Sequence, residues 1–500
     1  MSPLIVFSAL LLYFGLLFII SHFTSRNSTN STFFTGNRQS PWYVVAYGMI
    51  GASISGVTFI SIPGETGNIG FSYFQLVLGY LLGYFVIATV LMPLYYRLNL
   101  ISIYSYLGKR FGLFSYKTGS LLFIISQTAG ASLRLFLAAS VLQLAFFDAY
   151  GIPFGITVLI TIALIWLYTY RSGIKTIVWT DTLQTTFMIL ALILSIIAID
   201  SALGLSTREM IQELQKQKLS NIFTFDWRSN HNFFKQFFAG AFIAIVMTGL
   251  DQNMMQKNLT CKNIREAQKN MITFSLVLVP VNLLFLTMGA LLYLYIQKMG
   301  INPGEYSAFF FDSVSGLYKN TDDLYPTLAI HYFPLMAGML FLMGIIAAAF
   351  SSADSSITAL TTTVCVDLLD FKELDTEKSR RTRLYVHMAV SALIFLVIMI
   401  FKAVNDRSVI SAVFTVAGYT YGPLLGLYSF GLFTRRNIRD KWIIPIAIIS
   451  PLVSWIISSN SVAWLWGYKF GFELLIMNGL ICFFLLWMSS IGRPHVNFKD

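Results

Sequence analysis

Charged residues are scarce in this chain. Only 11% of its 500 residues are Asp, Glu, Lys or Arg, whereas 56% are hydrophobic and 16% are aromatic. Soluble globular domains carry about 25% charged residues. The composition therefore excludes an ordinary soluble protein, and the polar residues that do occur within apolar stretches become informative.

Cysteine and histidine are also rare, with three and five copies respectively. The cysteines have no metal-binding spacing and imply no disulfide framework. The histidines are scattered, and no phosphate-binding loop or reactive constellation is present in the sequence. These absences argue against an enzyme, and we expect none.

Long apolar runs occupy most of the chain. A run of ~18 residues or more is long enough to cross the ~30 Å of a bilayer core. The first run is too long for a signal peptide and has no small-residue cleavage site, so it is interpreted as a true span. We predict an all-α integral membrane protein that forms one transporter-sized unit over residues 1–500, with about 13 spans at 4–22, 43–70, 74–96, 118–148, 152–170, 178–203, 235–255, 272–298, 333–369, 383–403, 408–433, 441–459 and 468–489.

The net charge is +11, and its positive residues are distributed by membrane side. This charge therefore does not indicate nucleic acid as a partner. Most Lys and Arg residues collect in alternate loops between the predicted spans. The positive-inside rule then places the N-terminus outside and the C-terminus in the cytoplasm. The rarity of cysteine and the short loops favour the plasma membrane of a bacterium, that is, its inner membrane.

A serine-rich segment lies within the apolar run at 333–369. Ala348, Ser351, Ser352 and Ser355 are spaced i, i+3, i+4 and i+7, which places them on one face of a helix. Hydrocarbon cannot hydrogen-bond such groups, so they face a protein interior or an aqueous path. A face lined with oxygen atoms is suited to a small hard cation.

Glycines and hydroxyl residues also cluster at mid-membrane depth in the run at 43–70. Gly48, Gly51 and Gly56 occur there together with Ser53 and Ser55. Glycine lowers helix stability by about 1 kcal/mol relative to alanine, and an unwound helix exposes carbonyls that can line a cavity or bind an ion. The alternative is a surface of small residues for close helix packing.

Three of the charged residues within or at the ends of predicted spans are functional candidates. Asp181 is explained either by ion binding or by a salt bridge to basic residues at the cytoplasmic edge. Asp251 is explained either by function or as a solvated helix end. Arg134 lies near the middle of its span, where a charge costs at least ~2.5–3.5 kcal/mol. It requires either a structural carboxylate partner or a ligand carboxylate bound by the guanidinium fork.

Several segments together resemble the sodium:solute symporter family. They are residues 33–38 (FFTGNR), 104–112 (YSYLGKRFG), 179–184 (WTDTLQ), 251–256 (DQNMMQ) and the serine-rich segment, in that order. The resemblance implies the LeuT type of fold, with two inverted five-helix repeats at about 43–203 and 235–433, one helix before them and two after. The first helix of each repeat would be broken at the bilayer midplane, here near residues 51–56 and 240–249.

The resemblance also implies a set of ion ligands. One sodium would be held by the carbonyls of Gly51, Ile54 and Ala348 and by the hydroxyls of Ser351 and Ser352. Sodium is a hard cation that prefers such oxygen ligands. A second sodium, which some family members carry, would use Asp181, Ser351 and Ser355. Asp354 departs from the family pattern, and its carboxylate would either strengthen that second site or share a proton with Asp181.

The implied substrate contacts point to an anion. They are Ser53, Ser55, Thr58, Gln75 and Arg134. The small hydroxyl of Thr58 argues against a hexose, Arg134 resembles the arginine of members that carry sialic acid, and the region 91–107 resembles members that carry monocarboxylates, vitamins or iodide.

We therefore expect a sodium-coupled symporter of a small solute that bears a carboxylate, such as sialic acid. The alternatives are a sodium/sugar symporter or a sodium/vitamin or monocarboxylate symporter, and less favoured ones are a channel or a sensor built on a transporter scaffold. The expected partners are the solute, sodium and the lipid bilayer, with no nucleic acid, and a single chain is expected to be the functional unit.

Overall fold

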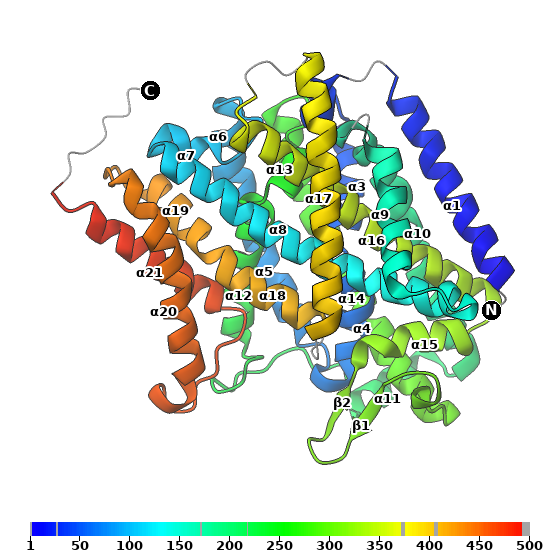
Figure 1. Ribbon diagram of the computed structural model, residues 1–500. Helices are drawn as coiled ribbons and strands as arrows, with labels where there is room; N and C mark the ends of the chain where they lie inside the picture. The colour runs from blue at the N-terminus through cyan, green and yellow to red at the C-terminus, as the bar shows by residue number, and fades with distance from the viewer. Residues whose placement is uncertain are drawn as a thin grey trace.

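The computed structural model describes residues 3–26, 29–170, 173–217, 219–371, 376–404 and 409–492. Helices dominate these residues (Figure 1). The first part of the chain contains α1 Pro3–Thr24, α2 Asn30–Thr35, α3 Trp42–Ser53, α4 Gly56–Ile69, α5 Tyr73–Val86, α6 Met92–Arg97, α7 Ser105–Arg110, α8 Leu113–Leu142, α9 Phe154–Thr169, α10 Ile174–Leu203 and α11 Thr207–Lys216.

The second part continues the helical bundle. It contains α12 Phe233–Ala244, α13 Gln252–Asn258, α14 Ile264–Met299, α15 Leu324–His331, α16 Leu335–Thr363, α17 Glu377–Val404, α18 Val409–Thr420, α19 Gly422–Phe433, α20 Ile443–Trp464 and α21 Leu474–Ser489. Strands β1 Phe310–Asp312 and β2 Leu317–Lys319 form an antiparallel hairpin, with Phe311 opposite Tyr318. The hairpin, α11 and α15 lie together at the lower end of the bundle in Figure 1.

Eight helices among the described residues are long and apolar enough to cross a membrane, or ten if each of two bent helix pairs counts as one span. Three shorter apolar helices, α9, α19 and α21, lie where further spans are predicted. Helices thus occupy all the predicted runs, while the count of about 13 spans stays a prediction. The predicted start of the eleventh span, residue 408, lies outside the described residues.

Helix α16 forms the centre of the bundle. The apolar window of its span is 78% buried, compared with 17% for α1 and 28% for α17 and α20. Helices α8 and α10 both pack against it. The serine-rich segment is therefore enclosed by protein on all sides, as its polarity requires.

The first bent pair is α3 and α4, which meet at 51°. Helix α3 ends at Ser53, and Ser55 adopts an extended conformation with φ −68° and ψ 171° before α4 begins at Gly56. The interruption falls inside the predicted range of 51–56. Because the helix stops here, the carbonyls of its last turn lose their usual i+4 partners.

The second bent pair is α12 and α13, which meet at 70°. A π-helical turn at Ile245–Gly249 follows α12, and the direction changes at Leu250 and Asp251. The prediction placed this break at 240–249, slightly too early. Gly240 has a packing role instead, because a Cβ there would lie 2.1 Å from the carbonyl oxygen of Leu76 in α5.

Candidate ion and solute site

A cavity lies between the two helix breaks. It encloses about 890 Å³, including space that opens toward solvent. Residues next to both interruptions border it, so both bent pairs contribute directly. Its lining comprises Ala52, Ser53, Ile54, Ser55, Thr58, Tyr73, Tyr80, Tyr84, Gln127, Arg134, Ile243, Ala244, Met247, Thr248, Asp251, Asn253, Met254, Leu278 and Asn282.

Four of the five predicted substrate contacts are brought together here, namely Ser53, Ser55, Thr58 and Arg134. Gln75 is not among the lining residues. Its amide nitrogen donates to the carbonyls of Ser72 and His231, at 3.1 and 2.9 Å, and its amide oxygen accepts from the backbone N–H of Thr224 at 3.2 Å. Gln75 therefore anchors the loop before α12, and its role as a solute contact stays a prediction that these hydrogen bonds do not favour.

Arg134 projects from the middle of α8. Its Nε donates to the carbonyl of Gly130 at 2.9 Å, which fixes the stem of the guanidinium group. Within the described part of the chain, no carboxylate oxygen lies within 4 Å of the guanidinium, so Arg134 forms no direct ion pair, and the buried carboxylate of Asp251 attracts it only at longer range. The terminal nitrogens consequently remain available to a group in the cavity.

Asp251 borders the same cavity, but both of its carboxylate oxygens already accept hydrogen bonds from the protein. Oδ1 accepts from the backbone N–H groups of Asn253 and Met254, at 2.8 and 3.2 Å, which caps α13. Oδ2 accepts from the hydroxyl of Tyr421 at 2.5 Å. Because only 3% of Asp251 is exposed, the alternative of a solvated helix end is wrong.

Other lining residues were not predicted from the sequence. Tyr73, Tyr80 and Tyr84 lie on one face of α5, and Asn282 projects from α14. Asn282 offered a signal, since it is a lone amide two residues after Pro280 in an apolar run. The tyrosines offered none, because aromatic residues are common throughout the chain.

The predicted ligands of the first sodium come from α3 and α16, which pack against each other. Gly51 and Ile54 lie at the end of α3, where carbonyls lack helical partners. The hydroxyl of Ser352 is buried and has no hydrogen-bond partner. A buried polar group without a partner costs about 1–3 kcal/mol, so a cation that accepts electron density from this oxygen fits the site.

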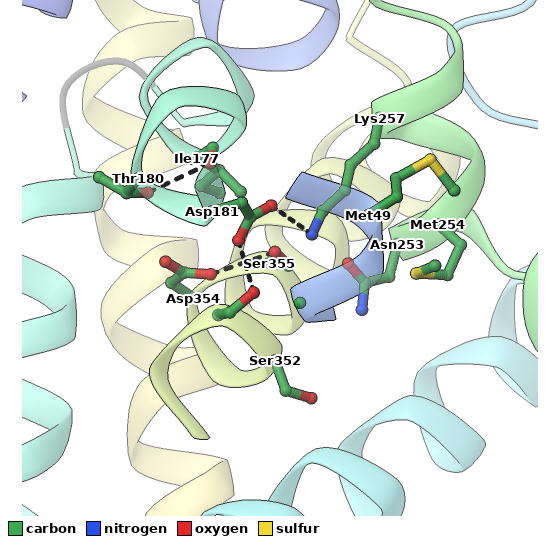
Figure 2. Close-up of polar contacts among 12 residues, drawn as sticks. Met49, Ile177, Thr180, Asp181, Asn253, Met254, Lys257, Ser352, Asp354 and Ser355 are labelled. Atoms are coloured by element: carbon green, nitrogen blue, oxygen red, sulfur yellow. Dashed lines mark hydrogen bonds and ion pairs between the residues drawn. The ribbon is translucent and has the colours of Figure 1, made fainter. Parts of the chain in front are cut away.

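The residues predicted for a second sodium are also close together, but Asp181 has a partner. Lys257 of α13 places Nζ 2.7 Å from Oδ2 of Asp181, and 1% of each side chain is exposed (Figure 2). Ser351 donates its hydroxyl hydrogen to Oδ1 of Asp181 at 2.6 Å. Asp181 therefore forms a buried ion pair with Lys257, which differs from the salt bridge to basic residues at the cytoplasmic edge that the sequence suggested.

Asp354 of α16 neighbours this ion pair and interacts electrostatically with both Asp181 and Lys257. Its Oδ2 accepts from the hydroxyl of Tyr168 at 2.8 Å, and its Oδ1 accepts from Ser355 at 3.1 Å (Figure 2). Both carboxylate oxygens thus have protein donors. No group of three or more His, Cys, Asp or Glu side chains that could hold a metal ion occurs among the described residues, so any ion here would rely largely on neutral oxygens.

Comparison with solved structures supports the fold. A sodium-coupled sialic acid symporter, solved substrate-bound in an outward-open state, superposes with a TM-score of 0.81 over 99% of both chains, at 19% identity. A nucleobase-cation-symport-1 family transporter in a closed conformation gives 0.56 over 94% of this chain and 97% of that one, at 13% identity. The predicted all-α membrane fold, with its broken helices, is confirmed at this level.

Sequence relatives agree with this fold. The sodium/sialic acid symporter NanT of Aliivibrio fischeri is 23% identical over 95% of this chain and 92% of its own length. SiaT of Proteus mirabilis, also a sodium/sialic acid symporter, is 23% identical over 87% and 85%. The sodium-coupled monocarboxylate transporter 2 of Bos taurus is 25% identical over 81% of this chain, which spans 64% of that protein.

A protein-family model also matches this chain. The model of the sodium:solute symporter family matches residues 33–440, which is most of the chain. The resemblance inferred from five short segments is therefore confirmed, as is the expectation of a transporter in place of an enzyme. The chain belongs to the sodium:solute symporter family and is a multi-pass membrane protein that uses sodium as its coupling ion.

Proposed function

We propose that this symporter uses inward sodium flow to import a small carboxylate-bearing solute, such as sialic acid, by alternating access. The observation that carries the proposal is Arg134. Its guanidinium borders the central cavity and has no carboxylate within 4 Å among the described residues. A permanent charge at this depth is costly, and a bound carboxylate would compensate it through two parallel hydrogen bonds.

The rest of the lining favours a polyhydroxylated acid over a simple monocarboxylate. Hydroxyl and amide groups border the cavity on several sides, from Ser53, Thr58, Gln127, Asn253 and Asn282. A sugar acid such as sialic acid offers many hydroxyl groups to such a lining, whereas a monocarboxylate offers few. The relatives named as sialic acid symporters support the same choice.

We propose the first sodium site at the contact of α3 with α16. Its ligands are the carbonyls of Gly51, Ile54 and Ala348 and the hydroxyls of Ser351 and Ser352. The unpartnered hydroxyl of Ser352 supports this assignment. Neutral ligands would make the site weak and reversible, which suits an ion that must be released into the cytoplasm.

The break between α3 and α4 offers a physical basis for coupling. Ile54 borders the solute cavity and also supplies a proposed sodium ligand. Ser53 and Ser55, its neighbours, are proposed solute contacts. Because one short turn would serve both sites, occupation of either stabilises the same conformation of that turn and raises the affinity of the other.

The proposed topology follows from the charge distribution. The N-terminus would be outside, the C-terminus in the cytoplasm of a bacterium, and the repeats at about 43–203 and 235–433 would form one transporting unit that works as a monomer. The three cysteines are buried, so single cysteines can be added and labelled. Ser315→Cys in the hairpin should react from outside in intact cells, whereas Arg435→Cys should react only after lysis. The reverse pattern would refute this orientation.

Uptake into liposomes tests the proposed function. Purified protein should accumulate radiolabelled sialic acid when a sodium gradient is applied, and an equal potassium gradient should not support uptake. Arg134→Ala should reduce uptake about 100-fold through loss of charged hydrogen bonds. Arg134→Lys keeps the positive charge but loses the two-pronged geometry of the guanidinium group. Its uptake should lie between that of the wild type and that of Arg134→Ala.

The controls separate solute recognition from general damage. Arg381→Ala alters an arginine that is 73% exposed on α17 and should leave uptake unchanged. If lactate competes for the solute site and sialic acid does not, the chain transports monocarboxylates. Uptake of a neutral sugar that is indifferent to Arg134→Ala would show the carboxylate proposal to be wrong.

A further inference from the structure

The buried ion pair between Lys257 and Asp181 lies where a second sodium was expected. Asp181 belongs to α10, and Lys257 belongs to α13, the second half of the bent pair α12 and α13. Figure 2 shows the lysine side chain reaching across to the carboxylate. The Nζ to Oδ2 distance is 2.7 Å, and 1% of each side chain is exposed.

Both oxygens of Asp181 are in use. Oδ2 accepts from Lys257, and Oδ1 accepts from Ser351 at 2.6 Å. A sodium ion at this carboxylate would need to replace the ammonium group. The displaced ammonium would then lose its hydrogen-bonded counter-charge and keep only the longer-range attraction of Asp354, which is strongly unfavourable in a buried site.

The neighbouring carboxylate is no easier to use. Asp354 accepts from Tyr168 and Ser355, so its two oxygens have donors. Ser355, the remaining predicted ligand, directs its hydroxyl hydrogen to Asp354 (Figure 2). The groups that would surround a second sodium are therefore bonded to one another or to Lys257.

We propose that the ammonium group of Lys257 is a fixed cation in the position of a second sodium, so that this symporter couples one sodium to each solute. The inference rests on the proposed function for its first sodium site. Lys257 also orients that site, because it holds Asp181, which in turn accepts the hydrogen of Ser351. The oxygen lone pairs of Ser351 then remain available to the first sodium.

Electrical measurements on liposomes provide the test. One sodium carried with one monovalent carboxylate moves no net charge, so uptake of sialic acid by the wild type should not respond to membrane potential. Lys257→Met frees Asp181 for a second sodium, so its uptake should become faster with a negative interior, and its sodium dependence should become sigmoidal. Lys257→Arg keeps the cation, so whatever rate of uptake it retains should stay insensitive to membrane potential.

A second variant addresses folding. Lys257→Met leaves Asp181 without a counter-charge in the absence of sodium, and this variant should gain more thermal stability from added sodium than the wild type gains. The double variant Asp181→Asn/Lys257→Met removes both charges of the pair and leaves Asp354 with its donors Tyr168 and Ser355. It should lose that additional stabilisation, and its uptake should again be insensitive to membrane potential.

The outcomes separate this inference from the proposed function. Electrogenic uptake of sialic acid by the wild type, with two sodium ions per solute, would overturn the role of Lys257 and leave the symport intact. A folded Lys257→Met variant with unchanged electrical and sodium behaviour would overturn it as well. Absence of any sodium-driven uptake by the wild type, together with normal sodium-dependent stabilisation, would instead reject the proposed solute.

Discussion

The backbone N–H of Gly51 donates to Oγ1 of Thr185 at 3.1 Å, which fastens the end of α3 to α10. The same hydroxyl donates to the carbonyl of Asp181 at 2.7 Å. The backbone at the first helix break is therefore held by α10 on one side while α16 lies on another. This contact requires glycine, because a Cβ on Gly51 would lie 2.2 Å from Oγ1 of Thr185.

Gly51→Ala should weaken sodium binding directly, in addition to any loss of stability. The added methyl group must push α3 away from α10, at a cost of about 1–3 kcal/mol for overpacking, and this shift would move the proposed carbonyl ligands. We expect the sodium concentration for half-maximal uptake to rise about tenfold or more. Sodium titration of uptake in liposomes measures it.

Two further variants localise this effect. Gly56→Ala is the matched control, since a Cβ there would lie 3.5 Å from Ile345, an ordinary contact, and uptake should stay within about twofold. Gly51→Ala/Thr185→Ala removes the nearest clashing atom and should partly recover sodium affinity. A Gly51→Ala protein with wild-type sodium dependence would contradict the proposed position of the ion.

Ser352→Ala tests the sodium site from the side of α16. The variant loses one proposed ligand and leaves no partner unsatisfied, because the hydroxyl has no hydrogen bond in the protein. A charged hydrogen bond is worth about 1.5–3 kcal/mol, so half-maximal uptake should need roughly 10- to 100-fold more sodium.

Thr363→Val is the control for Ser352→Ala. Thr363 lies further along α16 and also has a buried hydroxyl without a partner, but it belongs to no proposed ion site. Its sodium dependence should match that of the wild type. Equal shifts in both variants would mean that α16 responds to any loss of a hydroxyl, and the ligand role of Ser352 would be refuted.

The sequence predicted the first helix break well and the second less accurately. At the first, glycines and hydroxyl residues converge over residues 51–56, and the interruption falls at Ile54 and Ser55. At the second, glycines are ambiguous, since Gly240 permits close packing against α5. The better signal was Asp251, because aspartate favours the N-cap of a new helix.

Long-range pairing limited the prediction of the site. Lys257 and Asp181 are separated by 76 residues, and no local pattern indicates that their side chains meet. Asp181 instead suggested a local explanation, a salt bridge to basic residues at the cytoplasmic edge. The partners of Gln75 were hidden for the same reason, because the loop that it anchors lies far along the chain. An amide in an apolar run indicates burial and does not name its partner.

Gln75→Ala should reduce stability without altering solute recognition. The variant loses hydrogen bonds to the carbonyl of His231 and the N–H of Thr224, which are partly buried, and each lost bond costs about 0.5–1.5 kcal/mol. We expect a lower melting temperature of the purified protein and an unchanged solute concentration for half-maximal uptake. A large rise in that concentration at unchanged stability would return Gln75 to the solute site.

Tyr421→Phe should weaken solute binding through Asp251. The hydroxyl of Tyr421 occupies Oδ2 of Asp251, and Asp251 and Arg134 border the same cavity. Without this hydroxyl, the carboxylate becomes free to compete with the solute for the guanidinium group, and half-maximal uptake should need about tenfold more solute. Asp251→Asn in the Tyr421→Phe background keeps a competent N-cap and removes the competing charge, so it should restore affinity. If the double variant binds solute as weakly as Tyr421→Phe alone, Tyr421 contacts the solute itself and does not act through Asp251.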